Sequence, residues 1–352
     1  MAKRLAVIIP YYNETPEQLQ FAVHGIAMQM GTDFSKLEVI MVNDCNPETV
    51  VDESFTSRWP MLDIKLLQTD HNAGCGVARQ VGIDNTDAEY VMFLDADDRY
   101  HNVEYLSAVC RVIKQGRYDI IMAPFYSDAC GTDYYNWITH GGLGCWMHNK
   151  IYRRQFLIDN ELRFHPDLKV HEDGYFNTIT YACSDRTTII KNVGVIWCNN
   201  PNSTVRRNNS EFFTGEMHTF MRAQCLAIEW LKEHHKAYQG TVCDVVIHAY
   251  VFLHQRLMEV EPEKVELCEG IVADSLAQYW DSAIEAPDVN LPTYWGDSLT
   301  GYQQAYWKSG EMVSESFPQW LERLGMKVPT LPDVRLLLDK VSTARRMVND
   351  DD

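Results

Sequence analysis

Three carboxylates stand within four residues of one another at the end of an apolar run in this 352-residue chain. The segment from Phe93 to Asp98 reads FLDADD, which places Asp95, Asp97 and Asp98 together. Carboxylates this close repel one another in a dry site, so they call for a counter-cation. Hard oxygen ligands suit Mg²⁺ or Mn²⁺, and either ion can bridge to phosphate oxygens. The pattern is typical of a divalent metal site or, alternatively, of a solvated turn whose Asp residues cap a helix.

A second acidic pair, Glu172 and Asp173, lies in the segment VHEDGY. Carboxylates in a first helical turn interact favourably with the helix dipole, so the pair could simply open a helix. It could instead supply a general base, because two close carboxylates raise the pKa of one of them towards neutrality. The sequence leaves both interpretations open.

Paired arginines, Arg206 and Arg207, are notable in a chain with 31 basic and 49 acidic residues and a formal net charge of −18. The guanidinium fork matches the geometry of phosphate oxygens. The pair therefore predicts a phosphate contact or, alternatively, a surface loop with solvated charges. The overall charge repels nucleic-acid backbones, which weighs against a nucleic-acid acceptor without excluding one.

These side chains must be positioned by the alternating strand and helix signals of the first 125 residues. Continuous apolar runs predict strands buried on both faces, with helically spaced apolar residues between them. The alternation favours a mainly parallel α/β sheet with helices on both faces. Ligands bind such sheets beyond the carboxyl ends of the strands, where Asp44 and Asp95 would gather. We expect strands at 5–9, 37–42, 64–67, 90–94 and 119–123, helices at 16–30, 74–83 and 103–113, and then helices at 150–158 and 172–183 and a strand at 187–197.

The chain changes character near residue 210, where glycine becomes sparse and long helical patterns begin. We therefore expect a catalytic domain over residues 1–210 and a mostly helical region over 211–352, with helices at 212–231 and 242–258. The helical region could bind the acceptor, form a homo-oligomer or brace the first domain.

The chain shows no sign of export or membrane insertion. No run reaches the ~18 uncharged apolar residues of a membrane-spanning helix, and the N-terminal apolar run is too short for a signal peptide. Ten cysteines without a CxxC pair are typical of reduced thiols. We expect a cytoplasmic protein with no membrane span.

Taken in order, these segments resemble the family 2 glycosyltransferases, which have the Rossmann-like GT-A fold. The resemblance covers about residues 5–207, and we can name none for the helical region after it. Two departures are Gln80, where the family has Asn, and Asp-Cys-Asn at 44–46, where it often has Asp-Gly-Ser. The matching segments are AVIIPYYN at 6–13, VND at 42–44, NAG at 72–74, ARQVGI at 78–83, FLDADD at 93–98, KIYR at 150–153, LRF at 162–164 and ED at 172–173.

The resemblance implies a role for each candidate residue. Asp173 would be the catalytic base, with Glu172 beside it in the catalytic pair. Asp97 would hold Mn²⁺ or Mg²⁺, and Asp98 would support the loop. The other candidates would bind a nucleotide-sugar donor: Pro10, Tyr12 and Glu14 along the base and ribose, Asp44 and Arg79 at the edge of a base such as uracil, Asp95 at the ribose, and Arg206 and Arg207 over the diphosphate.

The implied function is inverting glycosyl transfer from a nucleotide-diphosphate donor, such as a UDP-sugar, to an acceptor hydroxyl. A nucleotidyltransferase that makes nucleotide sugars is one alternative, but it needs a glycine-rich phosphate loop after the first strand, where this chain has YYNE. A non-catalytic glycan-binding module is another, but it would not need carboxylates in both the metal and the base positions. A dehydrogenase lacks support, because no GxGxxG follows any predicted strand. The acceptor, whether a glycan, a protein or modified DNA, stays open.

Overall fold

The chain folds into two compact units in the computed structural model, residues 1–207 and residues 208–352. This division lies close to the boundary that the sequence predicts at residue 210, and the roles predicted for the two parts remain predictions. The structure describes residues 3–49, 51–128, 136–138, 146–198, 200, 210–256, 262–286, 315 and 317–329.

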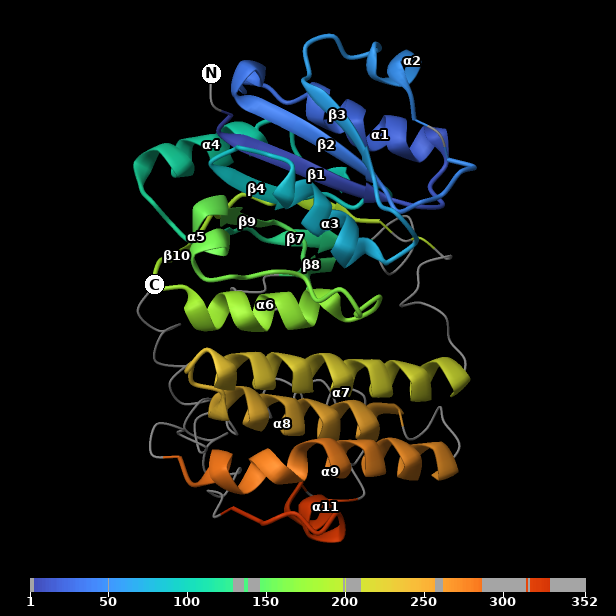
Figure 1. Ribbon diagram of the computed structural model, residues 1–352, viewed down its shortest axis with the longest axis vertical. Helices are drawn as coiled ribbons and strands as arrows, with labels where there is room; N and C mark the ends of the chain where they lie inside the picture. Colours follow the sequence, from blue (N-terminus) through green and yellow to red (C-terminus); the bar gives the residue numbers. More distant parts are fainter. Residues whose placement is uncertain are drawn as a thin grey trace, which may run out of the picture. The chain divides into compact units, whose positions relative to one another are not determined.

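A seven-stranded sheet forms the centre of the first unit (Figure 1). In spatial order its strands are β10 (Thr187–Ile189), β6 (Ile120–Met122), β9 (Lys150–Arg153), β4 (Tyr90–Phe93), β1 (Leu5–Tyr11), β2 (Leu37–Asn43) and β3 (Ile64–Gln68). The pairs β4–β1, β1–β2, β2–β3 and β10–β6 are parallel. The mainly parallel α/β sheet predicted from the sequence is therefore confirmed.

β9 is the exception, because it runs antiparallel to both β4 and β6. The predicted helix over 150–158 is wrong for its first four residues, and α5 (Arg154–Asp159) begins only after this strand. Ile151 and Tyr152 are fully buried, and pairing along both edges outweighs their local helical signal. As a result of the reversed direction, the N-terminal end of β9 lies at the edge where β4 ends.

Helices cover both faces of this sheet (Figure 1). They are α1 (Pro16–Ala27), α2 (Glu53–Thr56), α3 (Cys75–Asp84), α4 (Tyr105–Gln115), α5 and α6 (Glu172–Cys183), with a short 3₁₀ helix at Phe34–Lys36. α1 and α4 share a core with the face of β1 that carries Val7. α3 packs on the opposite face, where a Cβ added to Gly82 would lie 2.5 Å from Ile8 Cγ2. Only glycine lets this helix approach the sheet so closely.

A second, four-stranded sheet was not predicted. In spatial order it comprises β5 (Arg99–Tyr100), β11 (Val195–Trp197), β7 (Phe125–Ser127) and β8 (Asn136–Ile138). The single strand predicted over 187–197 is wrong, since its two ends belong to different sheets. The chain passes between them at Gly194, where a Cβ would lie 2.4 Å from the Tyr105 ring and 2.5 Å from Asn149 Oδ1.

The second unit is helical where the structure describes it, which confirms the predicted helical region. Its described helices are α7 (Ser210–Glu233), α8 (Gln239–Arg256), α9 (Pro262–Ile284) and α11 (Phe317–Arg323). Trp280 and Trp320 are fully buried in its core, and Arg323 forms ion pairs with Glu269 and Glu315. Within the described residues, no helix combines the length and apolarity needed to span a bilayer.

Candidate active site

Parallel strands bring the predicted donor-side residues to one edge of the first sheet. Leu94 N donates to Ile8 O at 3.1 Å, and Asp44 N donates to Tyr11 O at 2.8 Å, so the ends of β1, β2 and β4 stay in register. The chain turns directly after β4, with Asp98 N donating to Asp95 O at 2.9 Å. This turn presents the three carboxylates that the sequence singled out.

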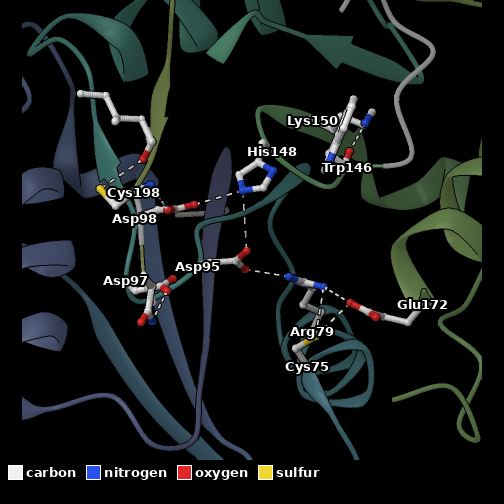
Figure 2. A network of polar contacts seen from close by, with 12 residues as sticks. Cys75, Arg79, Asp95, Asp97, Asp98, Trp146, His148, Lys150, Glu172 and Cys198 are labelled. Carbon is white, nitrogen blue, oxygen red and sulfur yellow. Dashed lines mark hydrogen bonds and ion pairs between the residues drawn. The ribbon is translucent and has the colours of Figure 1, made fainter. Parts of the chain in front are cut away.

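Asp98 is the buried member of the turn, with an exposed fraction of 1%. Its Oδ1 accepts a hydrogen bond from Cys198 N at 2.9 Å, and its Oδ2 lies 3.1 Å from His148 Nε2 (Figure 2). Burial raises the pKa of Asp98 to about 6. Burial also opposes the charged form of His148, but Asp98 and Asp95 outweigh it and raise the imidazole pKa. Asp98 and His148 therefore hold the turn against the segment that enters β9.

Asp97 is the half-buried member of the turn, and its Oδ2 accepts a hydrogen bond from Asn200 Nδ2 at 2.8 Å. Its pKa is raised, chiefly by burial and further by the charge of Asp95. Glu14 feels the same charges: burial is the largest cause of its raised pKa, and Asp97 and Asp95 add to it. The charges of the carboxylate turn therefore reach Glu14, which lies just beyond the end of β1.

Arg79 joins this turn to the second acidic pair. Its Nη2 lies 2.6 Å from Asp95 Oδ1, and its Nη1 lies 2.8 Å from Glu172 Oε1 (Figure 2). The guanidinium carbon lies 5.8 Å from the centre of the Phe93 ring and 6.0 Å from that of Phe164. Burial disfavours the charge of Asp95, but Arg79 outweighs it and holds the pKa of that carboxyl below its usual value.

The first turn of α6 packs on the first turn of α3. Glu172 is buried, and its Oε1 also accepts a hydrogen bond from Cys75 Sγ at 2.9 Å. A Cβ added to Gly76 would lie 2.7 Å from Glu172 Cγ, so the contact requires glycine there. Burial and the charge of Glu172 raise the pKa of the Cys75 thiol, which keeps it a neutral donor to the carboxylate.

Asp173 is the half-buried neighbour of Glu172. Its Oδ1 accepts a hydrogen bond from Gly174 N at 2.7 Å. Burial and the adjacent charge of Glu172 raise its pKa to about 7, against the lowering effect of Arg79. A carboxyl that titrates near neutrality suits proton transfer at physiological pH. The helix predicted at 172–183 is confirmed, and its N-cap, His171, has a left-handed backbone with φ of 61°.

Both carboxylate oxygens of Asp44 accept hydrogen bonds from other groups of the protein. Its Oδ1 accepts from Thr69 Oγ1 at 2.9 Å and from Ala73 N at 3.0 Å, and its Oδ2 accepts from Gly74 N at 2.7 Å. Asp44 therefore fixes the loop that leads into α3, and Gly74 adopts a φ of +95° to make this possible.

The remaining predicted donor residues lie around the end of β1. Pro10 belongs to β1 and is buried, whereas Tyr12 is 38% exposed just beyond the strand. Tyr12 N donates to Glu14 Oε2 at 2.6 Å, which orders the turn. Arg206 and Arg207 lie outside the described residues.

Sequence reasoning missed two members of this network, His148 and Cys75. Each contacts a predicted carboxylate through the fold, and Cys75 reaches Glu172 across 97 positions. His148 lies two residues before the matching KIYR segment, and this position was the only sequence feature that linked it to the predicted site.

The residues after β4 fit a divalent cation by the chemistry of their donor atoms. One donor atom each from Asp95, Asp98 and His148 lie within 4.8 Å of one another. Carboxylate oxygens suit Mg²⁺ and Mn²⁺, and an imidazole favours Mn²⁺ of the two. However, Arg79 contacts Asp95 and Cys198 N donates to Asp98, whereas the half-buried Asp97 accepts a hydrogen bond from the Asn200 amide.

Comparison with known proteins identifies this architecture. Residues 6–169 match the profile of Glycosyl transferase family 2. The chain carries a family 2 glycosyltransferase domain. This domain contains the end of β4, α3 and the entry to β9, and it stops three residues before the acidic pair of α6.

Curated relatives of this glycosyltransferase domain include two bacterial enzymes. Poly(ribitol-phosphate) beta-N-acetylglucosaminyltransferase TarS of Staphylococcus aureus is 27% identical over 205 residues, covering 53% of this chain and 34% of TarS. Glycosyltransferase GlyA of Streptococcus pneumoniae is 24% identical over 212 residues, covering 52% of this chain and 29% of GlyA. The chain thus spans about a third of the length of these relatives.

Solved structures confirm the GT-A fold. S. aureus TarS 1-349 in complex with UDP-GlcNAc has a TM-score of 0.62 and 18% identity, covering 87% of this chain and 92% of that chain. The same protein in complex with UDP has a TM-score of 0.55, covering 88% of this chain and 92% of that one.

Proposed function

We propose that this chain transfers a sugar from a UDP-sugar to an acceptor hydroxyl with inversion at the anomeric carbon. The observation that carries the proposal is the network through Arg79, which contacts Asp95 at 2.6 Å and Glu172 at 2.8 Å. Arg79 therefore links a carboxylate of the proposed donor side to Glu172, the residue next to Asp173, the proposed base. Structures of TarS 1-349 with UDP and with UDP-GlcNAc favour UDP as the nucleotide.

Asp173 acts as the general base in this proposal. It accepts the proton of the acceptor hydroxyl while the hydroxyl oxygen attacks the anomeric carbon. The bond from that carbon to the diphosphate breaks, and its electron pair leaves with UDP. Because the oxygen enters opposite the leaving group, a single displacement inverts the configuration. A pKa of about 7 lets Asp173 be unprotonated at neutral pH and still accept the proton.

The donor lies along the carboxyl ends of β1, β2 and β4 in this proposal. Tyr12 and Glu14 line the base and ribose beside Pro10, and Asp95 bonds the ribose. Asp44 acts on the nucleotide through the loop that it fixes. Arg206 and Arg207 contribute positive charge to the diphosphate.

Asp97 holds the divalent cation in this proposal, because its carboxylate is half-buried and is not held by Arg79 as Asp95 is, or by Cys198 N as Asp98 is. When bound there, Mn²⁺ or Mg²⁺ supplies positive charge that stabilises the departing diphosphate. Asp98 and His148 brace the turn from within. The helical second unit contributes acceptor binding, oligomer contacts or bracing, and the cytoplasmic location stays a prediction.

A panel of nucleotides and nucleotide sugars tests the donor class. Ligands that bind the native state raise the melting temperature by mass action. We expect UDP and UDP-sugars with Mn²⁺ to raise it more than GDP-sugars or Mn²⁺ alone. We also expect Mn²⁺ to induce slow hydrolysis of one UDP-sugar, which a binding module would not catalyse. No stabilisation by any nucleotide, together with no hydrolysis, would contradict the proposed function.

A further inference from the structure

We propose that Trp146 binds the acceptor of the transfer, and that this acceptor presents an uncharged sugar ring to the indole. The inference rests on the proposed function, in which Asp173 takes a proton from an acceptor hydroxyl. It narrows that acceptor from any hydroxyl compound to a sugar. None of the roles that the family resemblance implied falls on Trp146.

The main chain of Trp146 is fixed beside the helix that carries the proposed base. Its carbonyl oxygen accepts a hydrogen bond from Asn177 Nδ2 at 3.3 Å. The ammonium of Lys150 donates to the same oxygen (Figure 2). Asn177 follows Asp173 by four residues in α6, so the two side chains project from the same side of the helix. The Trp146 carbonyl therefore lies about one helical turn from the proposed base.

Both anchors of this carbonyl are buried side chains. Asn177 is 2% exposed, and its Oδ1 accepts a hydrogen bond from the Tyr152 hydroxyl at 2.7 Å. Lys150 and Tyr152 belong to β9, which is paired along both edges. Because the anchors hold the main chain of Trp146, its indole can be exchanged without removing them.

The indole of Trp146 is half-buried and begins a row of rings that leads to the donor side. Its ring centre lies 6.1 Å from that of Phe125, at an interplanar angle of 68°. Phe125 stacks on His148 at 4.9 Å, and His148 Nε2 lies 3.1 Å from Asp98 Oδ2 in the turn after β4. Trp146 thus stands between that turn and the proposed base, where an acceptor must lie to meet both.

The chemistry of an indole selects a ring. Trp offers a broad, flat apolar face with few rotatable bonds. A sugar ring has a matching face of C–H groups and a rim of hydroxyls, whereas an acyclic polyol has no such face. Packing of the ring on Trp146 would leave the hydroxyls at its rim to meet Asp173.

The charge around Trp146 favours an uncharged acceptor. Lys150 is 6% exposed, and its ammonium lies at the Trp146 carbonyl and 5.9 Å from the centre of the Tyr181 ring. This positive charge supports the main chain and is not presented to a ligand. The formal net charge of −18 also repels an anionic acceptor. Recognition therefore falls on the ring and the hydroxyls of the acceptor.

Two variants of the full chain test the role of the indole. Trp146→Ala removes the ring, and Trp146→Phe keeps a smaller ring on the same main-chain anchors. Tyr118→Ala is the matched control, because Tyr118 is also half-buried and its main-chain oxygen accepts a hydrogen bond from the Tyr90 hydroxyl at 2.9 Å. Tyr118 precedes β6, which runs in the direction of β4, so it lies at the opposite edge of the sheet from the carboxylate turn.

The rate of UDP release separates acceptor binding from the donor side of the reaction. With a UDP-sugar and Mn²⁺ alone, water is the acceptor. Methyl glycosides of hexoses and N-acetylhexosamines then probe a sugar acceptor, while glycerol and ribitol supply hydroxyls without a ring. Calorimetry of UDP binding with Mn²⁺ checks that each variant keeps its donor site.

We expect at least one methyl glycoside to accelerate UDP release by the parent, and glycerol and ribitol to leave the rate unchanged. Trp146→Ala should lower kcat/KM for that glycoside at least about tenfold, because the packed apolar surface is lost. Its hydrolysis rate and UDP Kd should stay within about threefold of the parent. Trp146→Phe should keep most of the response to the glycoside, and Tyr118→Ala should keep all of it.

A full response to the glycoside in Trp146→Ala would overturn the proposal. So would a parent that hydrolyses a UDP-sugar but is accelerated only by glycerol or ribitol, or by none of these compounds. Equal losses of hydrolysis, UDP affinity and glycoside response in Trp146→Ala would reduce Trp146 to a structural role and overturn it as well. A parent that neither binds UDP nor hydrolyses any UDP-sugar contradicts the proposed function instead.

Discussion

Two acidic pairs face each other across this site, and each divides into a buried and a half-buried member. In the turn after β4, Asp98 is buried against His148 while Asp97 is half-buried. At the start of α6, Glu172 is buried against Arg79 while Asp173 is half-buried. In both regions the buried acid fixes the backbone, and in our proposal its half-buried neighbour meets the ligand.

The two pairs differ in their counter-charge and in the partner of the accessible acid. His148 can lose its proton, whereas Arg79 keeps its charge at any physiological pH. Asp97 accepts from the side chain of Asn200, whereas Asp173 accepts from the main chain of its own helix. If the proposed roles hold, burial and partner, more than residue type, decide which acid of a pair does chemistry.

The largest expected effect comes from removing the accessible acid of α6. Asp173→Asn should lower kcat on the order of 10²–10⁴-fold while UDP affinity stays near that of the parent. In the parent, kcat should rise with pH through about 7, because Asp173 must be unprotonated, and the variant should lose this limb. Stopped-time product assays from pH 5.5 to 8.5 measure both.

Asp185→Asn, an exposed change just beyond the same helix, is the control for Asp173→Asn and should keep the parent rate. Near-normal turnover in Asp173→Asn would remove the base assignment. Loss of UDP affinity in step with kcat would reduce Asp173 to a structural role.

The next effect separates the two acids of the β4 turn. Asp97→Asn should weaken Mn²⁺ binding in the presence of UDP at least tenfold and lower kcat on the order of 10²-fold, since metal charge on the diphosphate is lost. His148→Asn should keep the Mn²⁺ affinity within about threefold but lower the melting temperature, because it removes the partner of a buried carboxylate. Electron paramagnetic resonance of free Mn²⁺ reports the affinity without turnover. The reverse pattern would place the ion among Asp95, Asp98 and His148.

The smallest effect probes the packing that holds Glu172. Gly76→Ala puts a Cβ 2.7 Å from Glu172 Cγ, so it should destabilise the fold by about 1–3 kcal/mol and lower kcat. Gly270→Ala, in α9 with open space at the same position, should stabilise by up to about 1 kcal/mol. Thermal unfolding of both variants measures the contrast. Equal melting temperatures would show that α6 moves freely from α3.

The sequence predicted the elements whose burial is uniform. β1 reads LAVIIPY with every residue buried. A continuous apolar run of this length is typical of a strand that lies between two neighbouring strands and is covered by helices on both faces. The position of the carboxylates after β4 was predictable as well, because parallel strands end at a common edge of the sheet. The pair at the start of α6 was predictable from its match to the family pattern.

Other features depended on contacts between distant segments, which local patterns do not contain. KIYR is a strand because β4 and β6 pair with both of its edges. Likewise, Arg79 pairs with Glu172 across 93 positions, and nothing near either residue specifies the other. The second sheet depends on Gly194, which lets the chain pass Tyr105 between β10 and β11.

The reversed direction of β9 has a consequence for the order in which the site is assembled. During synthesis, Arg79 and the acids of the β4 turn leave the ribosome before any of their partners from β9 or α6. β9 must then insert between β4 and β6, with both edges paired, before His148 reaches Asp98. A nascent chain that stops short of this insertion has Arg79 for Asp95 but lacks His148 for Asp98. We therefore expect the insertion of β9 and the pairing of His148 with Asp98 to occur together in folding.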